Sequence, residues 1–159
     1  MSLQNITEKE VLEAQEKWAI GVIDIGKKFL EKADYSSCAE IFLDTLYAFS
    51  MGDVLFKPTL ASETQFRLTK KAALSYFIGG NPDFTEDTGF ALMNWQKIRF
   101  ENKRIYIEGN IAITMGNYFM KKNNIETKVE YSFVYKKDNQ GNLRIILHDS
   151  HLPYIHGTF

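Results

Sequence analysis

The stretch Val129-Glu130-Tyr131-Ser132-Phe133-Val134-Tyr135 alternates between two kinds of side chain. Successive side chains of a strand point to opposite faces. Val129, Tyr131, Phe133 and Tyr135 would therefore share one face, while Glu130 and Ser132 would share the other. Such a segment is typical of a strand that packs one face on a core and turns the other to solvent. The stretch predicts a sheet with one buried face.

Similar extended segments surround this stretch along the C-terminal part of the chain. Four are expected, near residues 91–100, 105–120, 127–136 and 143–152. The turns between them are predicted at Asn102-Lys103, at Asn123-Asn124 and over residues 138–142. A shorter strand is expected at 54–56, and Pro58 restricts it to an edge or an end because proline cannot donate to a sheet ladder.

The N-terminal part of the chain has helical periodicity instead. Thr7 and Glu10 have the spacing of a capping box, which predicts a long helix over residues 8–32. Gly21 and Gly26 within it indicate close packing against a neighbour. A second helix carries an apolar stripe between residues 38 and 49, and a third runs from about 69 to 77, stopped by Gly79-Gly80.

The order of these elements predicts the fold class. Helices first and strands afterwards describe an α+β domain in which an antiparallel sheet curls around a helical layer. A length of 159 residues suits one domain, and we expect residues 1–159 to form it.

The amino-acid composition indicates which kinds of binding partner to expect. The chain has 19 basic and 20 acidic residues, a balance that argues against nucleic acid and anionic membranes and favours a small-molecule partner. The first twenty residues lack the pattern of a secretory signal, and no apolar run reaches the ~18 residues needed to cross a bilayer. A cytoplasmic protein is expected, and its single cysteine excludes an intrachain disulfide.

All three histidines lie near the C-terminus, and the last predicted strand carries two of them. In a regular strand His148 and Ser150 share one face with Arg144 and Ile146. Asp149 and His151 share the opposite face with Leu143, Ile145 and Leu147.

This parity disfavours two familiar kinds of site. A zinc site needs three or four ligands, whereas His148 and His151 would point apart and no cysteine cluster assists them. A Ser-His-Asp triad of Ser150, His151 and Asp149 is weaker still, because neighbours on one strand cannot easily form the relay. No phosphate-binding loop is present either.

Hydroxyl, imidazole and carboxylate groups remain, against a background of twelve Phe, eight Tyr and two Trp. This mixture suits a small, mostly apolar pocket with a few orienting polar groups. The alternative, which the sequence alone favours for any single residue, is that the tyrosines and histidines only satisfy one another at the rim of the core.

Several blocks of the sequence, in order along the chain, resemble the iota-class carbonic anhydrases. The blocks are Leu55-Phe56-Lys57-Pro58-Thr59, residues 73–80, residues 86–91, Trp95, residues 99–102, residues 115–119, residues 129–133 and the ending from Leu147 to Tyr154. That family is similar to the association domain of calcium/calmodulin-dependent protein kinase II, within the nuclear transport factor 2-like superfamily. The resemblance implies a cone, in which a curved antiparallel sheet wraps over N-terminal helices with a pocket in its mouth.

The resemblance also implies reversible hydration of carbon dioxide to bicarbonate. Some members use manganese, while others work without metal and hold bicarbonate with threonine, tyrosine and serine hydroxyls. Thr59, Tyr76 and Ser150 best match those roles here, and His148 or His151 would move protons. We expect no metal and no other cofactor.

The ending departs from the family pattern. The family usually has His-His-Ser-Ser before Leu-Pro, whereas this chain has His148-Asp149-Ser150-His151. A catalytic hydroxyl at the fourth position would be lost, and one at the third would be kept by Ser150. Asp149 would disfavour bicarbonate nearby unless His151 or Lys57 offsets its charge.

Two further questions stay open at this point. Lys57 and Arg67 are the cationic candidates for substrate binding near the pocket, with solvated surface roles as the alternative. The chain could also be a non-catalytic module that binds a small ligand or dimerises, as the kinase association domain assembles. A homodimer is expected in either case, because curved sheets of this type often leave an apolar outer face.

Overall fold

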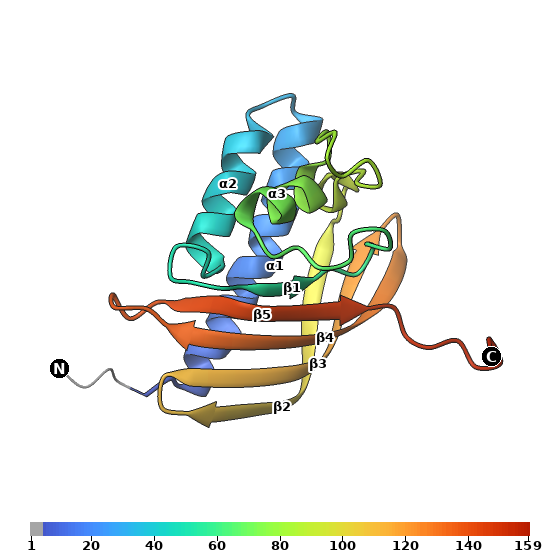
Figure 1. The fold of residues 1–159 in the computed structure, drawn as a ribbon. Coiled ribbons are helices and arrows are strands. Elements are labelled where there is room, and N and C mark those ends of the chain that lie inside the picture. Colours follow the sequence, from blue (N-terminus) through green and yellow to red (C-terminus); the bar gives the residue numbers. More distant parts are fainter. Residues whose placement is uncertain (1–4) are drawn as a thin grey trace.

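One curved, open sheet of five strands forms the base of the molecule (Figure 1). The computed structural model describes residues 5–159. In space the strands follow the order β1-β5-β4-β3-β2, with β1 parallel to β5 and the other neighbours antiparallel. Their bounds are β1 Leu55–Lys57, β2 Lys97–Glu108, β3 Ile111–Lys122, β4 Ile125–Lys137 and β5 Leu143–His151. The predicted α+β class is confirmed, and β1 lies at an edge as Pro58 requires.

The helices cover the inner side of this sheet. They are α1 Glu8–Leu30, α2 Tyr35–Leu46, α3 Lys70–Ile78 and the 3₁₀ helix η1 Phe90–Leu92. The predicted capping box is present, since the amide of Glu10 donates to the Thr7 hydroxyl at 3.2 Å and the amide of Thr7 donates to the Glu10 carboxylate at 2.8 Å. The long first helix therefore begins where the local sequence predicts.

The two glycines of α1 lie at close approaches. A Cβ atom at Gly21 would lie 2.5 Å from the ring of Phe42 in α2, and one at Gly26 would lie 2.7 Å from the carbonyl oxygen of Ala91 in η1. Neither distance leaves room for a methyl group. The predicted close packing is confirmed.

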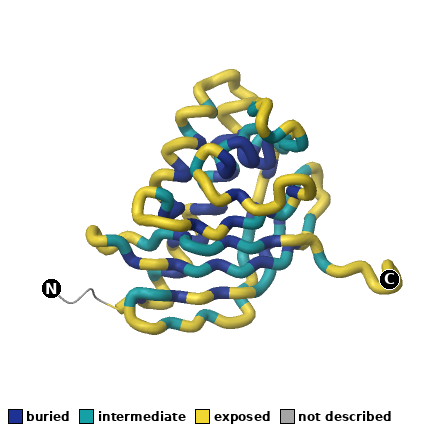
Figure 2. Tube along the Cα trace, viewed as in Figure 1, coloured by how far each residue is buried: buried dark blue, intermediate teal, exposed yellow. Residues whose placement is uncertain are grey.

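The inner face of β4 is the wall of the core. Val129, Tyr131, Phe133 and Tyr135 are all buried, as their alternation predicts, and buried positions recur along the neighbouring strands (Figure 2). Trp18 of α1 packs its indole against the rings of Tyr118 and Phe133. One aromatic core thus joins the longest helix to the sheet.

The first two predicted strands are misplaced in two respects. The turn expected at Asn102-Lys103 is wrong, because β2 continues through it with a bulge between Asn102 and Arg104 and the chain reverses only after Glu108. The side-chain amide of Asn102 donates to the side-chain oxygen of Gln15 at 2.8 Å. The two residues are 87 positions apart, so this contact cannot be predicted from the local sequence. Residues 90–92 are also not extended but form η1.

A second irregularity changes which residues of β5 face the core. Tyr135 pairs with Ile145, but Val134 pairs with Leu147, so that Ile146 is an extra residue in β5. The prediction that Ile145 shares a face with Leu147 is wrong for this reason. His148 and Ser150 do share the inner face and are both buried, as predicted.

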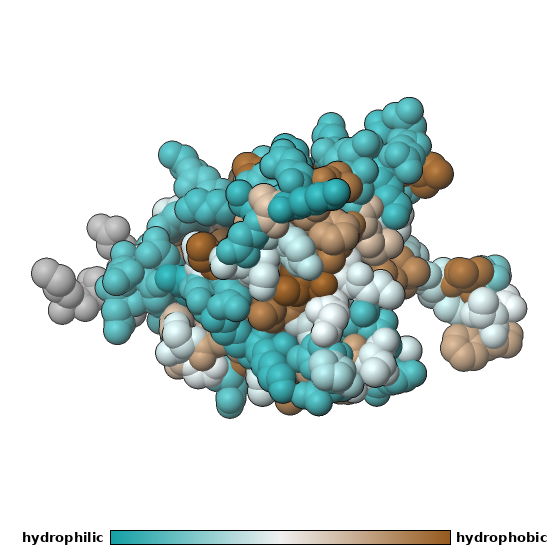
Figure 3. Space-filling model, turned by 90° about the horizontal axis from the view of Figure 1, so that it is seen from above, coloured by the Kyte–Doolittle hydropathy of each residue, from teal (hydrophilic) through white to brown (hydrophobic). Residues whose placement is uncertain are grey.

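Seen from above, from the side of the helices, the molecule shows hydrophobic residues near its centre, and hydrophilic residues surround most of them (Figure 3). Among residues 5–159, no helix combines the length and the apolar character needed to cross a membrane.

Candidate active site

Three hydroxyl groups meet on the inner side of the sheet, and they come from β3, from β5 and from the segment that follows β1. The Thr59 hydroxyl oxygen lies 2.9 Å from that of Ser150 and 3.3 Å from that of Tyr118. Ser150 and Tyr118 are buried, whereas Thr59 is partly exposed. The hydroxyl cluster, as we call Thr59, Tyr118 and Ser150, therefore reaches the surface through Thr59.

Each of these hydroxyls can both donate and accept a hydrogen bond. Burial raises the pKa of Tyr118 to about 12, although hydrogen bonds with Ser150 and Thr59 act in the opposite direction. Tyr118 is thus a neutral phenol at physiological pH. The cluster can orient an oxygen-rich small molecule without carrying a charge of its own.

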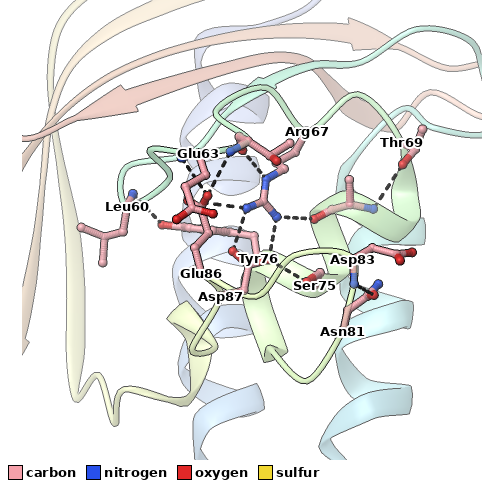
Figure 4. A network of polar contacts seen from close by, with 12 residues as sticks. Leu60, Glu63, Arg67, Thr69, Ser75, Tyr76, Asn81, Asp83, Glu86 and Asp87 are labelled. Atoms are coloured by element: carbon pink, nitrogen blue, oxygen red, sulfur yellow. Dashed lines mark hydrogen bonds and ion pairs between the residues drawn. The ribbon is translucent and has the colours of Figure 1, made fainter.

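Tyr76 of α3 lies beside the segment that carries Thr59. Its hydroxyl accepts a hydrogen bond from the amide of Leu60 at 3.3 Å (Figure 4). Burial raises the pKa of Tyr76 well above its usual value, and its ring stacks on Phe90 with 5.2 Å between centroids. Tyr76 is therefore a fixed, protonated phenol next to the hydroxyl cluster.

His148 lies on the same face of β5 as Ser150, in an aromatic environment. Its ring stacks on Phe56 with centroids 4.7 Å apart and meets the edge of Phe133 at 4.4 Å. Burial, followed by the positive charge of Lys57, lowers the pKa of His148 well below its usual 6.5. The imidazole is neutral at physiological pH.

Lys57 brings a positive charge to the edge of this region. Its ammonium group donates to the backbone carbonyl of Ser150 at 2.9 Å. The side chain is partly buried. A cation held here is suited to attract an anion toward Ser150.

Arg67 has a different environment, which Figure 4 shows. Its guanidinium is fully buried and donates to both carboxylate oxygens of Asp87, at 2.6 and 2.7 Å, and to the carbonyls of Thr64 and Ala72. A solvated surface role for Arg67, one of the two alternatives above, is wrong. These bonds fix the loop between β1 and α3.

Glu86 fixes the same loop from the other side. Its carboxylate accepts hydrogen bonds from the amides of Ser62, Glu63 and Thr64 at 2.7, 2.8 and 2.9 Å. Burial opposes its ionisation, but these three amides and Arg67 outweigh that effect and lower the pKa of Glu86. The loop that begins at Thr59 is thus anchored to residues 86–87.

Two predicted site residues lie on the other side of the sheet. His151 is exposed, with its Nδ1 atom 3.1 Å from the Glu130 carboxylate. Asp149 is paired in register with Ser132 of β4 and shares the outer face of β5 with His151. The structure brings together Thr59, Tyr76, Ser150 and His148, but not Asp149 or His151. Lys57 is in register with Asp149, and it reaches this region only through its ammonium group, which donates to the Ser150 carbonyl.

Tyr118 is a functional candidate that sequence reasoning did not single out. It lies on the inner face of β3, and only the pairing of that strand with β4 places its ring 5.5 Å from Tyr131 and its hydroxyl next to Thr59. The signal in the sequence was its place in the block of residues 115–119.

Residues 5–159 offer few side chains that are placed to bind a metal ion. No group of three or more His, Cys, Asp or Glu side chains that could hold a metal ion occurs there. Neutral alcohols and phenols are weaker ligands for divalent metals than carboxylates, imidazoles and thiolates. The arrangement at the cluster is suited to hydrogen bonding.

Comparison with known proteins gives a consistent picture. A family model described as metal-independent carbonic anhydrase matches residues 9–152. A metal-independent carbonic anhydrase from Nostoc sp. (strain PCC 7120 / SAG 25.82 / UTEX 2576) is 44% identical over 153 residues, which cover 94% of this chain and 75% of that protein.

Solved structures are similar as well. The iota-carbonic anhydrase from a cyanobacterium, crystallised in complex with bicarbonate, has a TM-score of 0.94 and 40% identity, with 98% of each chain covered. A nuclear transport factor 2-like protein from Salmonella enterica has a TM-score of 0.54 at 13% identity, covering 94% of this chain and 93% of its own. The latter likeness confirms the predicted nuclear transport factor 2-like fold.

Proposed function

The chain belongs to the metal-independent carbonic anhydrase family, and from this premise we propose that it interconverts carbon dioxide and bicarbonate at the hydroxyl cluster. The observation that carries the proposal is the meeting of the Thr59 and Ser150 hydroxyls at 2.9 Å beside a wall of aromatic rings. This combination offers hydrogen bonds to water and bicarbonate and an apolar surface for carbon dioxide.

In the hydration direction, a water molecule held by Thr59 and Ser150 attacks the carbon of carbon dioxide. A carbon–oxygen bond forms, and one carbon–oxygen π pair moves onto an oxygen of carbon dioxide, which becomes the anionic oxygen of bicarbonate. The water gives up one proton, which leaves toward solvent along the side where Thr59 is exposed. Hydrogen bonds that strengthen as charge develops lower the barrier.

Tyr76 and Lys57 have supporting roles in this proposal. The protonated phenol of Tyr76 is a donor for an oxygen of the forming bicarbonate. The ammonium of Lys57, which donates to the carbonyl of Ser150 at 2.9 Å, favours the negative product over neutral carbon dioxide.

The altered ending His148-Asp149-Ser150-His151 is compatible with this activity. Ser150 is the third position of the ending, and it contributes the buried hydroxyl bonded to Thr59. The Asp149 side chain lies on the outer face of β5, in register with Lys57, and in this proposal it makes no contact with bicarbonate. We propose that the third position carries the hydroxyl that the reaction needs.

The test is carbon dioxide hydration by the purified chain, followed with a pH indicator in a stopped-flow instrument. We expect the same rate with and without a metal chelator. Ser150→Ala and Tyr76→Phe should each lower kcat/KM by about 10²-fold, the usual effect of removing one preorganised donor. Ser132→Ala is the matched control, because Ser132 faces the outer side of β4.

Two results would reject parts of this proposal. A wild-type rate equal to that of buffer alone would remove the activity. Full activity in both Ser150→Ala and Tyr76→Phe would keep the activity but remove this site.

We also propose that two copies of the chain associate through the outer face of the sheet. Tyr106, Ile113 and Met115 lie on that face and are about half exposed, at 54%, 45% and 56%. Covering such residues is a common basis for symmetric dimers. A solution mass equal to one chain would contradict this.

A further inference from the structure

A chain of hydrogen bonds leads from the first helix to His148. The indole N–H of Trp18 donates to the hydroxyl of Tyr47 at 3.0 Å, and that hydroxyl lies 2.9 Å from Nδ1 of His148. All three side chains are buried, with at most 2% of any of them exposed. Because water does not reach these groups, their hydrogen bonds must be made to one another or to other buried groups.

The direction of the first bond is fixed by chemistry. An indole N–H can only donate, so the Tyr47 oxygen accepts from Trp18. Burial raises the pKa of Tyr47 well above its usual value, and its hydroxyl keeps its proton. The hydroxyl proton of Tyr47 then needs an acceptor, and the nearby Nδ1 of His148 is one if it carries no proton.

The alternatives leave more buried groups without a bond. If Nδ1 carried the proton and donated to Tyr47, both the Tyr47 proton and the lone pair of Nε2 would lack partners among the described residues. If Tyr47 donates to Nδ1, only the N–H at Nε2 lacks a hydrogen-bond partner among the described residues. Since every buried polar group without a hydrogen bond destabilises the protein, the second arrangement, which has fewer such groups, is favoured.

Protonation of both nitrogens is disfavoured by the surroundings of the ring. Phe56 stacks on one side of the imidazole and Phe133 packs edge-on, which leaves an apolar environment. The positive charge of Lys57 acts in the same direction as burial and lowers the pKa of His148 further. These contacts favour a neutral imidazole, and the hydrogen-bond count favours its single proton on Nε2.

This N–H is the one polar atom of His148 without a hydrogen-bond partner in residues 5–159. Nδ1 and Nε2 diverge from the ring, and Nδ1 is directed to Tyr47 on the helix side. His148 and Ser150 lie two residues apart on the same inner face of β5, and the Tyr118 ring is 6.4 Å from the imidazole.

Building on the proposed function, we propose that Tyr47, oriented by Trp18, is a positioning residue that holds His148 in the neutral Nε2–H form. His148 then acts as a hydrogen-bond donor to an oxygen of the bound water or bicarbonate. It does not carry protons to and from solvent. Tyr47 acts only through the histidine, by fixing which nitrogen bears the proton.

The test reads the protonation of His148 directly. In the full chain labelled with ¹⁵N at histidine, NMR should show a protonated Nε2 and an unprotonated Nδ1 for His148. Addition of bicarbonate should shift the Nε2–H resonance. Detection of the proton on Nδ1, or a resonance that bicarbonate leaves unchanged, would overturn the inference.

Tyr47→Phe tests the positioning role, and Tyr135→Phe is its matched control. Tyr135 is an equally buried tyrosine of the same core, and its hydroxyl has no hydrogen-bond partner among the described residues. In Tyr47→Phe we expect a proton at Nδ1 in part of the molecules. Its kcat should fall by about 10-fold to 100-fold, the range for outer-sphere partners that orient a histidine in metal sites. Tyr135→Phe should change neither the His148 resonances nor kcat.

The outcomes separate this inference from the proposed function. Hydration activity with an Nδ1–H histidine would retain the function and reject the inference. An inactive chain whose Nε2–H resonance shifts with bicarbonate would reject the function and retain the inference. If Tyr47→Phe fails to fold, as judged by circular dichroism, the wild-type spectra with and without bicarbonate still decide.

Discussion

The hydroxyl oxygens of Thr59 and Ser150 lie 2.9 Å apart although 91 positions separate the two residues in the chain. Parallel pairing of β1 with β5 produces this contact, since Lys57 is in register with Asp149. Pro58 then ends β1 and turns Thr59 toward the inner side. The candidate site thus depends on the edge strand.

The hydration activity should depend on the hydroxyl of Thr59 and not on the shape of its side chain. Thr59→Ser keeps the hydroxyl and should retain most of the hydration rate. Thr59→Val keeps the volume but removes the bonds to Ser150 and Tyr118, and should lower kcat/KM by about 10²-fold. A Thr59→Val variant as fast as wild type in the stopped-flow assay would exclude a catalytic hydroxyl at this position.

Two ion pairs of equal length should contribute differently to the free energy of unfolding, because one is buried and the other is exposed. Arg67–Asp87 and Lys71–Asp83 both have a nitrogen–oxygen distance of 2.6 Å, but the first pair is buried and the second is more than 60% exposed on both sides. Asp87→Ala removes the carboxylate that accepts two hydrogen bonds from the buried guanidinium and leaves it only the longer ion pair with Glu86 at 3.9 Å, so it should lower the free energy of unfolding by about 3–5 kcal/mol. Asp83→Ala should lower it by less than about 1 kcal/mol. Urea unfolding measures both, and equal losses would contradict the comparison.

Gly26→Ala should destabilise the protein although alanine favours helices. The added methyl group would lie 2.7 Å from the carbonyl oxygen of Ala91, a backbone atom that cannot swing away. Overpacking of this kind costs about 1–3 kcal/mol, against a gain in helix propensity of about 1 kcal/mol. The exposed neighbour Lys27→Ala is the control and should change little. An increase in thermal midpoint for Gly26→Ala would show that α1 and η1 can separate.

His148 should make the fold sensitive to mild acid. Because burial and then Lys57 lower its pKa in the folded state, the unfolded chain takes up a proton first as the pH falls below 6.5. The contribution of this group is complete above pH 6.5 and is lost as the pH falls toward the folded pKa. The slope is about 1.4 kcal/mol per pH unit for one proton.

The measurement is the difference in unfolding free energy between wild type and His148→Asn from pH 7 downward to about pH 5, above the range in which the carboxylates titrate. The difference should shrink with falling pH, because only the wild type has this buried imidazole. Parallel curves for the two proteins would contradict a neutral buried His148.

Local signals in the sequence were sufficient for most elements. The capping box of Thr7 and Glu10, the alternation along Val129–Tyr135 and the stop at Gly79 each involve residues a few positions apart. Such features depend on backbone geometry and on side-chain periodicity, which the chain carries with it. The helices, the buried face of β4 and the position of β1 at an edge followed from them.

The errors occur where a distant contact competes with a local signal. Asn102 resembles a turn residue, but its side chain is bonded to Gln15 of α1, and β2 continues past it with a bulge. The extra residue Ile146 likewise depends on how β5 pairs with β4. Counting alternate residues along β5 alone therefore assigns Ile145 and the residues before it to the wrong face.

By itself, the sequence determined the α+β class, the inner face of the sheet and the shared face of His148 and Ser150, because these depend on short-range periodicity. Only the tertiary structure decided that Tyr118 joins Thr59 and Ser150, that Asp149 and His151 lie outside, and that Trp18, Tyr47 and His148 form one hydrogen-bonded chain. Each of these contacts joins residues from different elements. Their distances and directions are set by strand register, bulges and the packing of one aromatic core, which no local pattern encodes.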